Sequence, residues 1–210
     1  GIVTVEVDEG GKPTFEIGKD AAWDHWEWNQ AIEEKVRGAD AVCFGTLGQR
    51  GQSPRAGIRK AMQLAKDEGI MRVHDVNLRP PFFDDAVIRD SLALCSVYKL
   101  SDDELERVCQ ACGIPLSDDP LQSLRAILEK YALEVLVMTK GAEGAVLLTS
   151  DSTYEQPGVK ATIVDTVGAG DSFTAALTLG LLRKDPFPDI LRHACEVAAQ
   201  VCSHAGAVPA

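Results

Sequence analysis

Apolar and polar positions alternate along the chain with two different periods. After residue 40, short apolar runs typical of strands alternate with longer amphipathic segments typical of helices. Strands that alternate with helices, several of them apolar throughout, indicate an α/β fold with a mainly parallel sheet flanked by helices on both faces. The predicted strands span residues 41–44, 71–76, 97–100, 135–138 and 145–148, and the predicted helices span residues 54–68, 84–95, 101–112, 121–131, 170–184 and 189–204.

The first 20 residues follow another pattern. Two alternating segments, residues 2–7 and 13–17, flank a glycine-containing turn at residues 8–11, which predicts a β-hairpin. The chain has 210 residues, a length typical of one domain. We therefore predict a hairpin element in residues 1–20 and one α/β domain in residues 21–210.

The composition excludes several classes of protein. Hydrophobic residues make up 45% and charged residues 25%, which is typical of a folded chain and not of a disordered one. The formal net charge is −11 and no run of five or more Lys or Arg occurs, so we expect no nucleic-acid partner. The longest uncharged apolar stretches have the length of a strand, well below the ~20 residues that cross a bilayer, so we expect no membrane span.

The chain has six cysteines, which we interpret as reduced thiols because a chain of this length builds its core without disulfides. Cys109 and Cys112 have the C-x-x-C spacing of metal and redox sites. No second pair of ligands accompanies them, and they end a predicted helix, where the helix dipole does not activate a thiolate. We interpret both as core residues and expect a cytoplasmic protein.

The most informative stretch is residues 163–177. A short apolar strand at residues 163–164 runs into a glycine-containing turn, and a helical period follows. Gly168, Ala169 and Gly170 should form the first turn of that helix, where unpaired N–H groups and small side chains favour a phosphate or oxyanion. Asp171 stands in the same turn, either to accept a proton from a hydroxyl or only to complement the helix dipole.

Four segments in order resemble the PfkB, or ribokinase-like, carbohydrate kinases. They include Asp165-Thr-Val-Gly-Ala-Gly-Asp-Ser-Phe-Thr-Ala-Ala-Leu, which is similar to the C-terminal signature of that family. The others are Phe44-Gly-Thr-Leu with Arg50, Asp75-Val-Asn-Leu-Arg79, and Val137-Met-Thr-Lys-Gly-Ala-Glu-Gly144. The resemblance covers nearly the whole chain, and the fructokinases are the most similar subgroup.

The resemblance implies a ribokinase-like fold and transfer of the ATP γ-phosphate to a sugar hydroxyl, with Mg²⁺. Asp171 would then be the catalytic base, and the N–H groups of Gly168, Ala169 and Gly170 would form the anion hole. The residues that it places beside the nucleotide are Thr139, Gly141, Gly144 and Lys99.

Other residues matched by the resemblance keep two interpretations. Asp75, Asn77 and Arg79 would bind the sugar or its phosphate, or form a turn held by side-chain hydrogen bonds. Glu104 would serve Mg²⁺ through water, or only the capping box with Ser101. Asp165 and the carbonyl of Val167 match positions that bind a monovalent cation such as K⁺.

Members of the family are longer at the N-terminus, where the resemblance places a glycine-rich Gly-Gly-x-x-Asn sugar-binding segment and a sugar-binding Asp. Residues 1–20 match a lid over the sugar that also forms a homodimer contact. Two alternatives to the sugar kinase stay open. One is a nucleotide- or sugar-binding protein or fragment without turnover, and the other is a kinase of the same fold that acts on a nucleoside or a keto-sugar acid.

Overall fold

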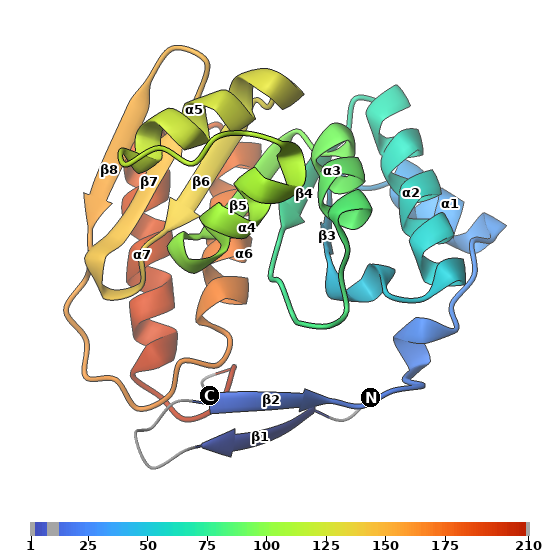
Figure 1. The fold of residues 1–210 in the computed structure, drawn as a ribbon, viewed down its shortest axis with the longest axis horizontal. Coiled ribbons are helices and arrows are strands. Elements are labelled where there is room, and N and C mark those ends of the chain that lie inside the picture. The colour runs from blue at the N-terminus through green and yellow to red at the C-terminus, as the bar shows by residue number, and fades with distance from the viewer. Residues whose placement is uncertain (1–2, 8–12, 209–210) are drawn as a thin grey trace.

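The computed structural model describes residues 3–7 and 13–208. Its centre is a six-stranded sheet in the order β3-β4-β5-β6-β7-β8 (Figure 1). Strands β3 to β6 run parallel, whereas β7 is antiparallel to β6 and β8 is antiparallel to β7, so the predicted mainly parallel sheet is confirmed. The strands are β3 (Ala41–Gly45), β4 (Met71–Asp75), β5 (Val97–Ser101), β6 (Val135–Thr139), β7 (Gly144–Leu148) and β8 (Thr153–Pro157).

Helices cover both faces of this sheet. Successive strand residues point to opposite faces, so Tyr98 and Leu100 of β5 pack in one core and Val97 packs in another. The first core lies against α1 (Gln30–Arg37), α2 (Gln52–Asp67), α3 (Asp85–Leu94), α4 (Asp102–Cys112) and α5 (Pro120–Tyr131). The second lies against α6 (Ala169–Arg183) and α7 (Phe187–Cys202).

Local sequence signals set the ends of the helices. Asp84 caps α3, because its side chain accepts a hydrogen bond from the amide of Val87 at 2.7 Å. Ser101 and Glu104 form the predicted capping box at the start of α4, and Gly113 ends that helix in the left-handed conformation. Three short 3-10 helices complete the fold: η1 (Ala22–Asp24), η2 (Leu47–Gln49) and η3 (Gly141–Glu143).

The predicted hairpin is present as β1 (Val3–Val7) and β2 (Pro13–Ile17), which pair antiparallel. The turn predicted at residues 8–11 lies outside the described residues. Figure 1 shows the hairpin at the end of the molecule where α6 begins and α7 ends. That position suits the lid predicted for residues 1–20, and the lid and dimer roles stay predictions.

Arg50 joins the base of the hairpin to the α/β domain. Its guanidinium donates to both carboxylate oxygens of Asp24, at 2.7 and 2.6 Å, and to the carbonyl of Gly18 at 2.7 Å. It also lies over the rings of Trp23 and Phe82. The hydrogen bonds from Arg50 lower the pKa of Asp24 to about 2.

Two parts of the secondary structure differ from the prediction. The strand predicted at residues 163–164 was wrong: Ile163 and Val164 are 61% and 60% exposed, and the Val164 amide donates to the carbonyl of Cys202 instead of to a strand. The strand β8 was not predicted, because its sequence Thr-Tyr-Glu-Gln-Pro is mostly polar, as suits a strand at the edge of the sheet.

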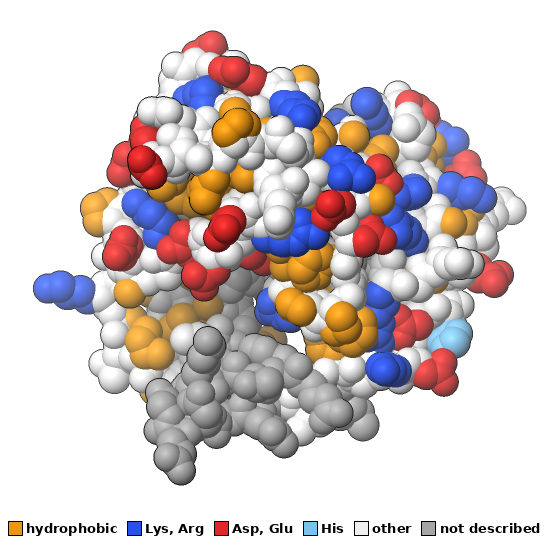
Figure 2. All heavy atoms as spheres, in the orientation of Figure 1, with side chains coloured by type: hydrophobic (Ala, Val, Ile, Leu, Met, Phe, Trp, Pro, Cys, Tyr) orange, Lys and Arg blue, Asp and Glu red, His pale blue; other side chains and the backbone are white. Residues whose placement is uncertain are grey.

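Cys109 and Cys112 are core residues, as the sequence predicted. All six thiols are free, and Cys109 and Cys112 are buried near the end of α4. Within the described residues, none of the helices is both long enough and apolar enough to cross a membrane. Figure 2 shows acidic and basic side chains interspersed on the face covered by α2–α5, with no continuous basic stripe there.

His74 lies in the centre of the first core. It is fully buried between the rings of Phe44 and Tyr98, with ring centroids 4.5 and 5.4 Å away. Among the described residues, neither ring nitrogen of His74 has a hydrogen-bond partner. Burial lowers the pKa of His74 from 6.5 to about 3. The folded chain therefore keeps this ring neutral, whereas the unfolded chain protonates it as the pH falls below 6.5.

We expect His74 to make the protein acid-sensitive. Its contribution to stability is complete above pH 6.5 and declines as the pH falls from 6.5 towards 3, because only the unfolded state gains the proton. Between about pH 7.5 and about pH 5, the loss of unfolding free energy should be smaller in His74→Phe than in the wild type by about 2 kcal/mol. Denaturant titrations of both proteins at the two pH values measure this difference, and equal losses would contradict it.

Candidate active site

The helix α6 begins where the sequence predicted. Gly168 caps it with φ +82°, and Ala169 is its first residue. The amide of Ser172 donates to the carbonyl of Gly168 at 2.9 Å, and the amide of Ala169 donates to the carbonyl of Thr166 at 3.3 Å. The amides of the following residues, Gly170 and Asp171, lie in the first turn, which lacks intrahelical acceptors. The sequence placed the amides of Gly168, Ala169 and Gly170 in an anion hole. Because the Ala169 amide already has the Thr166 carbonyl as its acceptor, we now expect the amides of Gly170 and Asp171, which lack a backbone acceptor within the described residues, to contact the anion.

A buried ion pair lies beside the start of α6. The ammonium of Lys99, in β5, is 3.0 and 3.1 Å from the two carboxylate oxygens of Asp75, the last residue of β4. The hydroxyl of Thr174, in the second turn of α6, donates to Oδ2 of Asp75 at 2.8 Å. The two strands and the helix are thus joined at the carboxyl edge of the sheet, where parallel α/β sheets bind ligands.

Gly170 makes the approach of Lys99 to the helix possible. A Cβ atom at position 170 would lie 3.2 Å from Nζ of Lys99. The ammonium therefore stands next to the backbone at the amino end of α6, and both groups attract negative charge. Asp171 belongs to the same helical turn. The geometry brings together two residues and one segment that the sequence assigned to different roles: Lys99, Asp75 and the Gly168–Asp171 segment.

Glu104 holds two segments in place. Its Oε2 accepts from the amide of Ser101 at 2.8 Å, which is the capping box, and its Oε1 accepts from the amide of Leu78 at 2.7 Å. Leu78 lies between Asn77, which has φ +38°, and Arg79, whose Nη1 donates to the carbonyl of Leu78 at 3.1 Å. Each Glu104 oxygen keeps a lone pair, so the cap does not preclude a water ligand of a metal ion. Among the described residues, no group of three or more His, Cys, Asp or Glu side chains could hold a metal by itself.

The other residues predicted to border the nucleotide lie at or just after the carboxyl end of β6, the strand next to β5. Thr139 ends β6, pairs in register with Ser101 of β5, and donates weakly to the carbonyl of Leu100 at 3.4 Å. Gly141, with φ +52°, has open space where a side chain would be. Gly144 has a structural role as well, because a Cβ there would lie 1.9 Å from the carbonyl oxygen of Gln156.

The segment before α6 is fastened to the C-terminal tail. The two oxygens of Asp165 accept from the amides of Val167, at 2.9 Å, and Gly206, at 3.0 Å, and these bonds lower the pKa of Asp165. A Cβ at position 168 would lie 2.8 Å from atoms of Ala207. The tail therefore packs directly against the glycine that begins α6.

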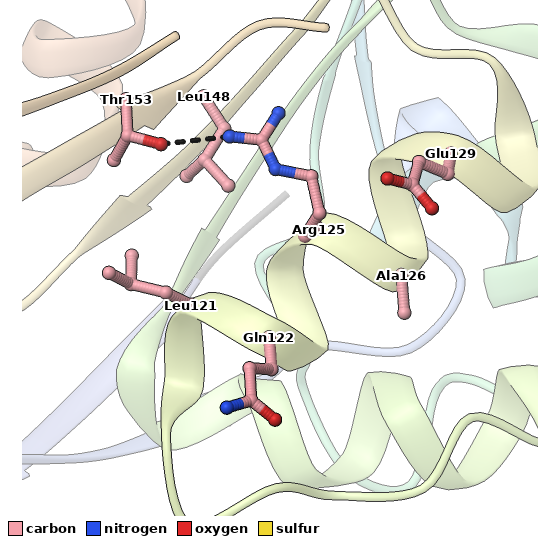
Figure 3. Close-up of a pocket in the computed structure, with 7 residues that line it drawn as sticks. All are labelled: Leu121, Gln122, Arg125, Ala126, Glu129, Leu148 and Thr153. Atoms are coloured by element: carbon pink, nitrogen blue, oxygen red, sulfur yellow. Dashed lines mark hydrogen bonds between the residues drawn. The ribbon is translucent and has the colours of Figure 1, made fainter. Parts of the chain in front are cut away.

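A hollow of about 400 Å³ lies elsewhere, between α5 and the β7–β8 turn. Figure 3 shows Arg125 reaching from α5 towards Thr153, and its guanidinium also donates to backbone carbonyls of that turn. Leu148 belongs to the core that packs against α1–α5, whereas Lys99 lies beside Gly170 of α6, so the hollow lies on the opposite face of the sheet from Lys99. The guanidinium of Arg125 already stabilises the turn between β7 and β8, so we assign no ligand to this hollow.

The structure adds Thr174 to the residues found by sequence analysis. It follows Gly170 by four residues, so it lies on the same face of α6. That spacing is the one sequence signal for its position, and nothing in the sequence connects it with Asp75.

The contact at Gly168 predicts a difference between two glycines. Gly168 and Gly206 both have φ +82°, but only Gly168 lacks space for a side chain. Gly206→Ala should lower the free energy of unfolding by about 1 kcal/mol through backbone strain, whereas Gly168→Ala should lower it by about 3 kcal/mol or more because it also displaces the tail. Denaturant unfolding of both variants checks this, and equal losses would show that the tail does not pack on Gly168.

Comparisons with known proteins agree with the geometry. The profile of the pfkB family carbohydrate kinases matches residues 1–210. Fructosamine kinase FrlD of Bacillus subtilis is 31% identical over 195 residues, which cover 82% of this chain and 68% of that protein. Aminoimidazole riboside kinase of Salmonella typhimurium is 30% identical over 145 residues, which cover 67% of this chain and 43% of that protein.

The fold matches solved kinases. A fructokinase with bound ATP from Xylella fastidiosa superposes with a TM-score of 0.82 at 19% identity, covering 98% of this chain and 68% of that one. The chain thus spans between 43% and 68% of the length of these relatives. Since the family profile matches throughout and the fold agrees, the chain belongs to the pfkB family of carbohydrate kinases.

Proposed function

We propose that this protein transfers the γ-phosphoryl group of ATP to a hydroxyl of a small sugar, as a fructokinase-like sugar kinase. The observation that carries the proposal is the placement of Lys99 beside Gly170, in the first turn of α6, which also contains Asp171. A cation and helix amides then lie beside a turn that also carries the solvent-exposed carboxylate of Asp171. Phosphoryl transfer needs this combination, since its loose transition state is stabilised by positioning and by neutralisation of charge.

Each of the site residues has its own role in the proposed reaction. Asp171 accepts the proton of the sugar hydroxyl while the oxygen of that hydroxyl forms a bond to the γ-phosphorus. The bond between that phosphorus and the β,γ-bridging oxygen breaks, and ADP leaves with the electron pair. The amides of the anion hole and the ammonium of Lys99 stabilise the charge on the transferred group. Thr139, Gly141 and Gly144 border the nucleotide along the end of β6.

The proposal includes two cations. Mg²⁺ would be held by the nucleotide phosphates and, through water, by Glu104, and it neutralises phosphate charge when bound. K⁺ would be held by Asp165 and the carbonyl of Val167. The hydrogen bond from Gly206 to Asp165 places the tail beside the segment that carries both oxygen atoms.

Asn77, Arg79 and the hairpin complete the proposed acceptor side. The loop that carries Asn77 and Arg79 is held by Glu104 beside the Lys99–Asp75 pair, where a guanidinium suits phosphate or sugar oxygens. The hairpin would close over the sugar and exclude water, which otherwise competes for the phosphoryl group. The homodimer contact through the hairpin and the cytoplasmic location belong to the same proposal.

The relatives favour a sugar or a riboside as acceptor, since their names include fructosamine kinase, aminoimidazole riboside kinase and fructokinase. The match to aminoimidazole riboside kinase gives the riboside its support as a second candidate. Assays of the full-length protein with ATP, Mg²⁺ and each of fructose, fructosamine and aminoimidazole riboside should show turnover with one acceptor far above the others. Nucleotide binding by calorimetry without any product would instead indicate a binding protein.

Asp171→Asn should lower kcat at least about 100-fold, because the amide cannot accept the proton. The variant should still bind ATP, since the anion hole remains. Asp189→Asn is the matched control: Asp189 also lies in the first turn of a helix, α7, but pairs with Arg192 on the surface. A kcat for Asp171→Asn similar to that of Asp189→Asn would contradict the assignment of the base.

A further inference from the structure

Three side chains form one buried network at the carboxyl edge of the sheet. Lys99 and Asp75 are 8% and 15% exposed, and each oxygen of Asp75 lies within 3.1 Å of Nζ of Lys99. Oδ2 of Asp75 also accepts the hydroxyl proton of Thr174 at 2.8 Å. Asp75 therefore accepts hydrogen bonds from two protein groups that come from different elements, β5 and α6, and only one lone pair, on Oδ1, is left over.

Two acceptors lie within hydrogen-bond distance of the Thr174 hydroxyl. It lies 2.8 Å from Asp75 and 2.9 Å from the carbonyl of Gly170, one turn earlier in α6. A hydroxyl has one proton, and a charged acceptor forms the stronger hydrogen bond. Thr174 thus ties the amino end of α6 to the carboxylate that holds Lys99.

The ammonium of Lys99 is left with a donor for a ligand. It has three N–H groups, and Asp75 accepts two of them. Its Nζ lies beside the backbone of Gly170, where a Cβ would approach it to 3.2 Å. Burial raises the pKa of Asp75, and the Lys99 ammonium and the Thr174 hydroxyl offset only part of that rise.

We propose that Asp75 and Thr174 are positioning residues, which hold the Lys99 ammonium and the first turn of α6 at a fixed separation so that both contact the same phosphoryl group. This inference rests on the proposed kinase function and deepens it. It replaces the sequence-based role of Asp75 as a ligand of the sugar or its phosphate. Thr174 acquires a role that the sequence did not indicate.

The two roles of Asp75 predict different kinetics. If Asp75 binds the acceptor, Asp75→Asn raises the KM for the acceptor, and Thr174→Val changes little. If Asp75 positions Lys99, both variants lower kcat while the KM for the acceptor stays nearly constant. Because the two side chains act through one hydrogen bond, their effects should also be non-additive.

The experiment measures kcat and KM of the full-length protein with Thr174→Val, Thr174→Ser, Asp75→Asn and the double variant Asp75→Asn/Thr174→Val. We expect Thr174→Val to lower kcat roughly 10-fold or more, as small misplacements of catalytic groups do. Thr174→Ser keeps the hydroxyl and should stay within about two-fold of the wild type, since its hydrogen bond is retained. The double variant should be no slower than Asp75→Asn alone.

Thr178→Val is the matched control. Thr178 lies one turn further along α6, is as buried as Thr174, and donates its hydroxyl to the carbonyl of Thr174 at 2.7 Å, away from Lys99. Thermal unfolding of each variant shows whether it is folded, and Asp75→Asn, which keeps the shape of the side chain, tests the inference even if Thr174→Val does not fold.

Two results would overturn the inference. A kcat for Thr174→Val equal to that of Thr178→Val does so, and so does an effect of Asp75→Asn confined to the KM for the acceptor. If Asp171→Asn is inactive in the same assay, the kinase proposal survives such a result and only the positioning role fails. If the wild type turns over no acceptor, both proposals fail together.

Discussion

The candidate site depends on one largely buried charged pair at the carboxyl ends of two interior strands of the sheet. Lys99 and Asp75 come from adjacent strands, and removing one of them would leave the other charge buried without a partner, at a cost of about 3–5 kcal/mol. The pair is tolerated because each charge neutralises the other and Thr174 adds a hydrogen bond. Such a pair adds little stability to a protein compared with apolar side chains. We therefore attribute the placement of this pair beside the amino end of α6 to its proposed role in binding the phosphoryl group.

The rest of the candidate site is fastened to this pair through the backbone. Glu104 connects the end of β5 with the loop that follows β4, and Asp165 connects the turn before α6 with the tail after α7. In both cases one carboxylate accepts hydrogen bonds from the amides of two segments that are distant in the sequence. These carboxylates hold the loops that carry the predicted ligands, and Arg50 does the same for the base of the hairpin.

The sequence predicted the parts of this fold that depend on local patterns. The apolar runs of β5 and β6 are buried on both faces, and the glycine turn at residues 168–170 leads into a helix. The period and the composition of these segments were therefore sufficient to predict them. The strand predicted at residues 163–164 failed because an apolar pair alone does not form a strand without a neighbour to pair with. The contact between Thr174 and Asp75 joins positions 99 residues apart, and one sequence contains no signal for such a contact.

The most direct test of the anion hole is a crystal structure of the full-length protein with Mg²⁺ and a non-hydrolysable ATP analogue. The terminal phosphate should lie within hydrogen-bond distance of the amides of Gly170 and Asp171 and of Nζ of Lys99, with Lys99 still paired to Asp75. A terminal phosphate bound elsewhere, with the amides at the start of α6 facing only water, would contradict the account.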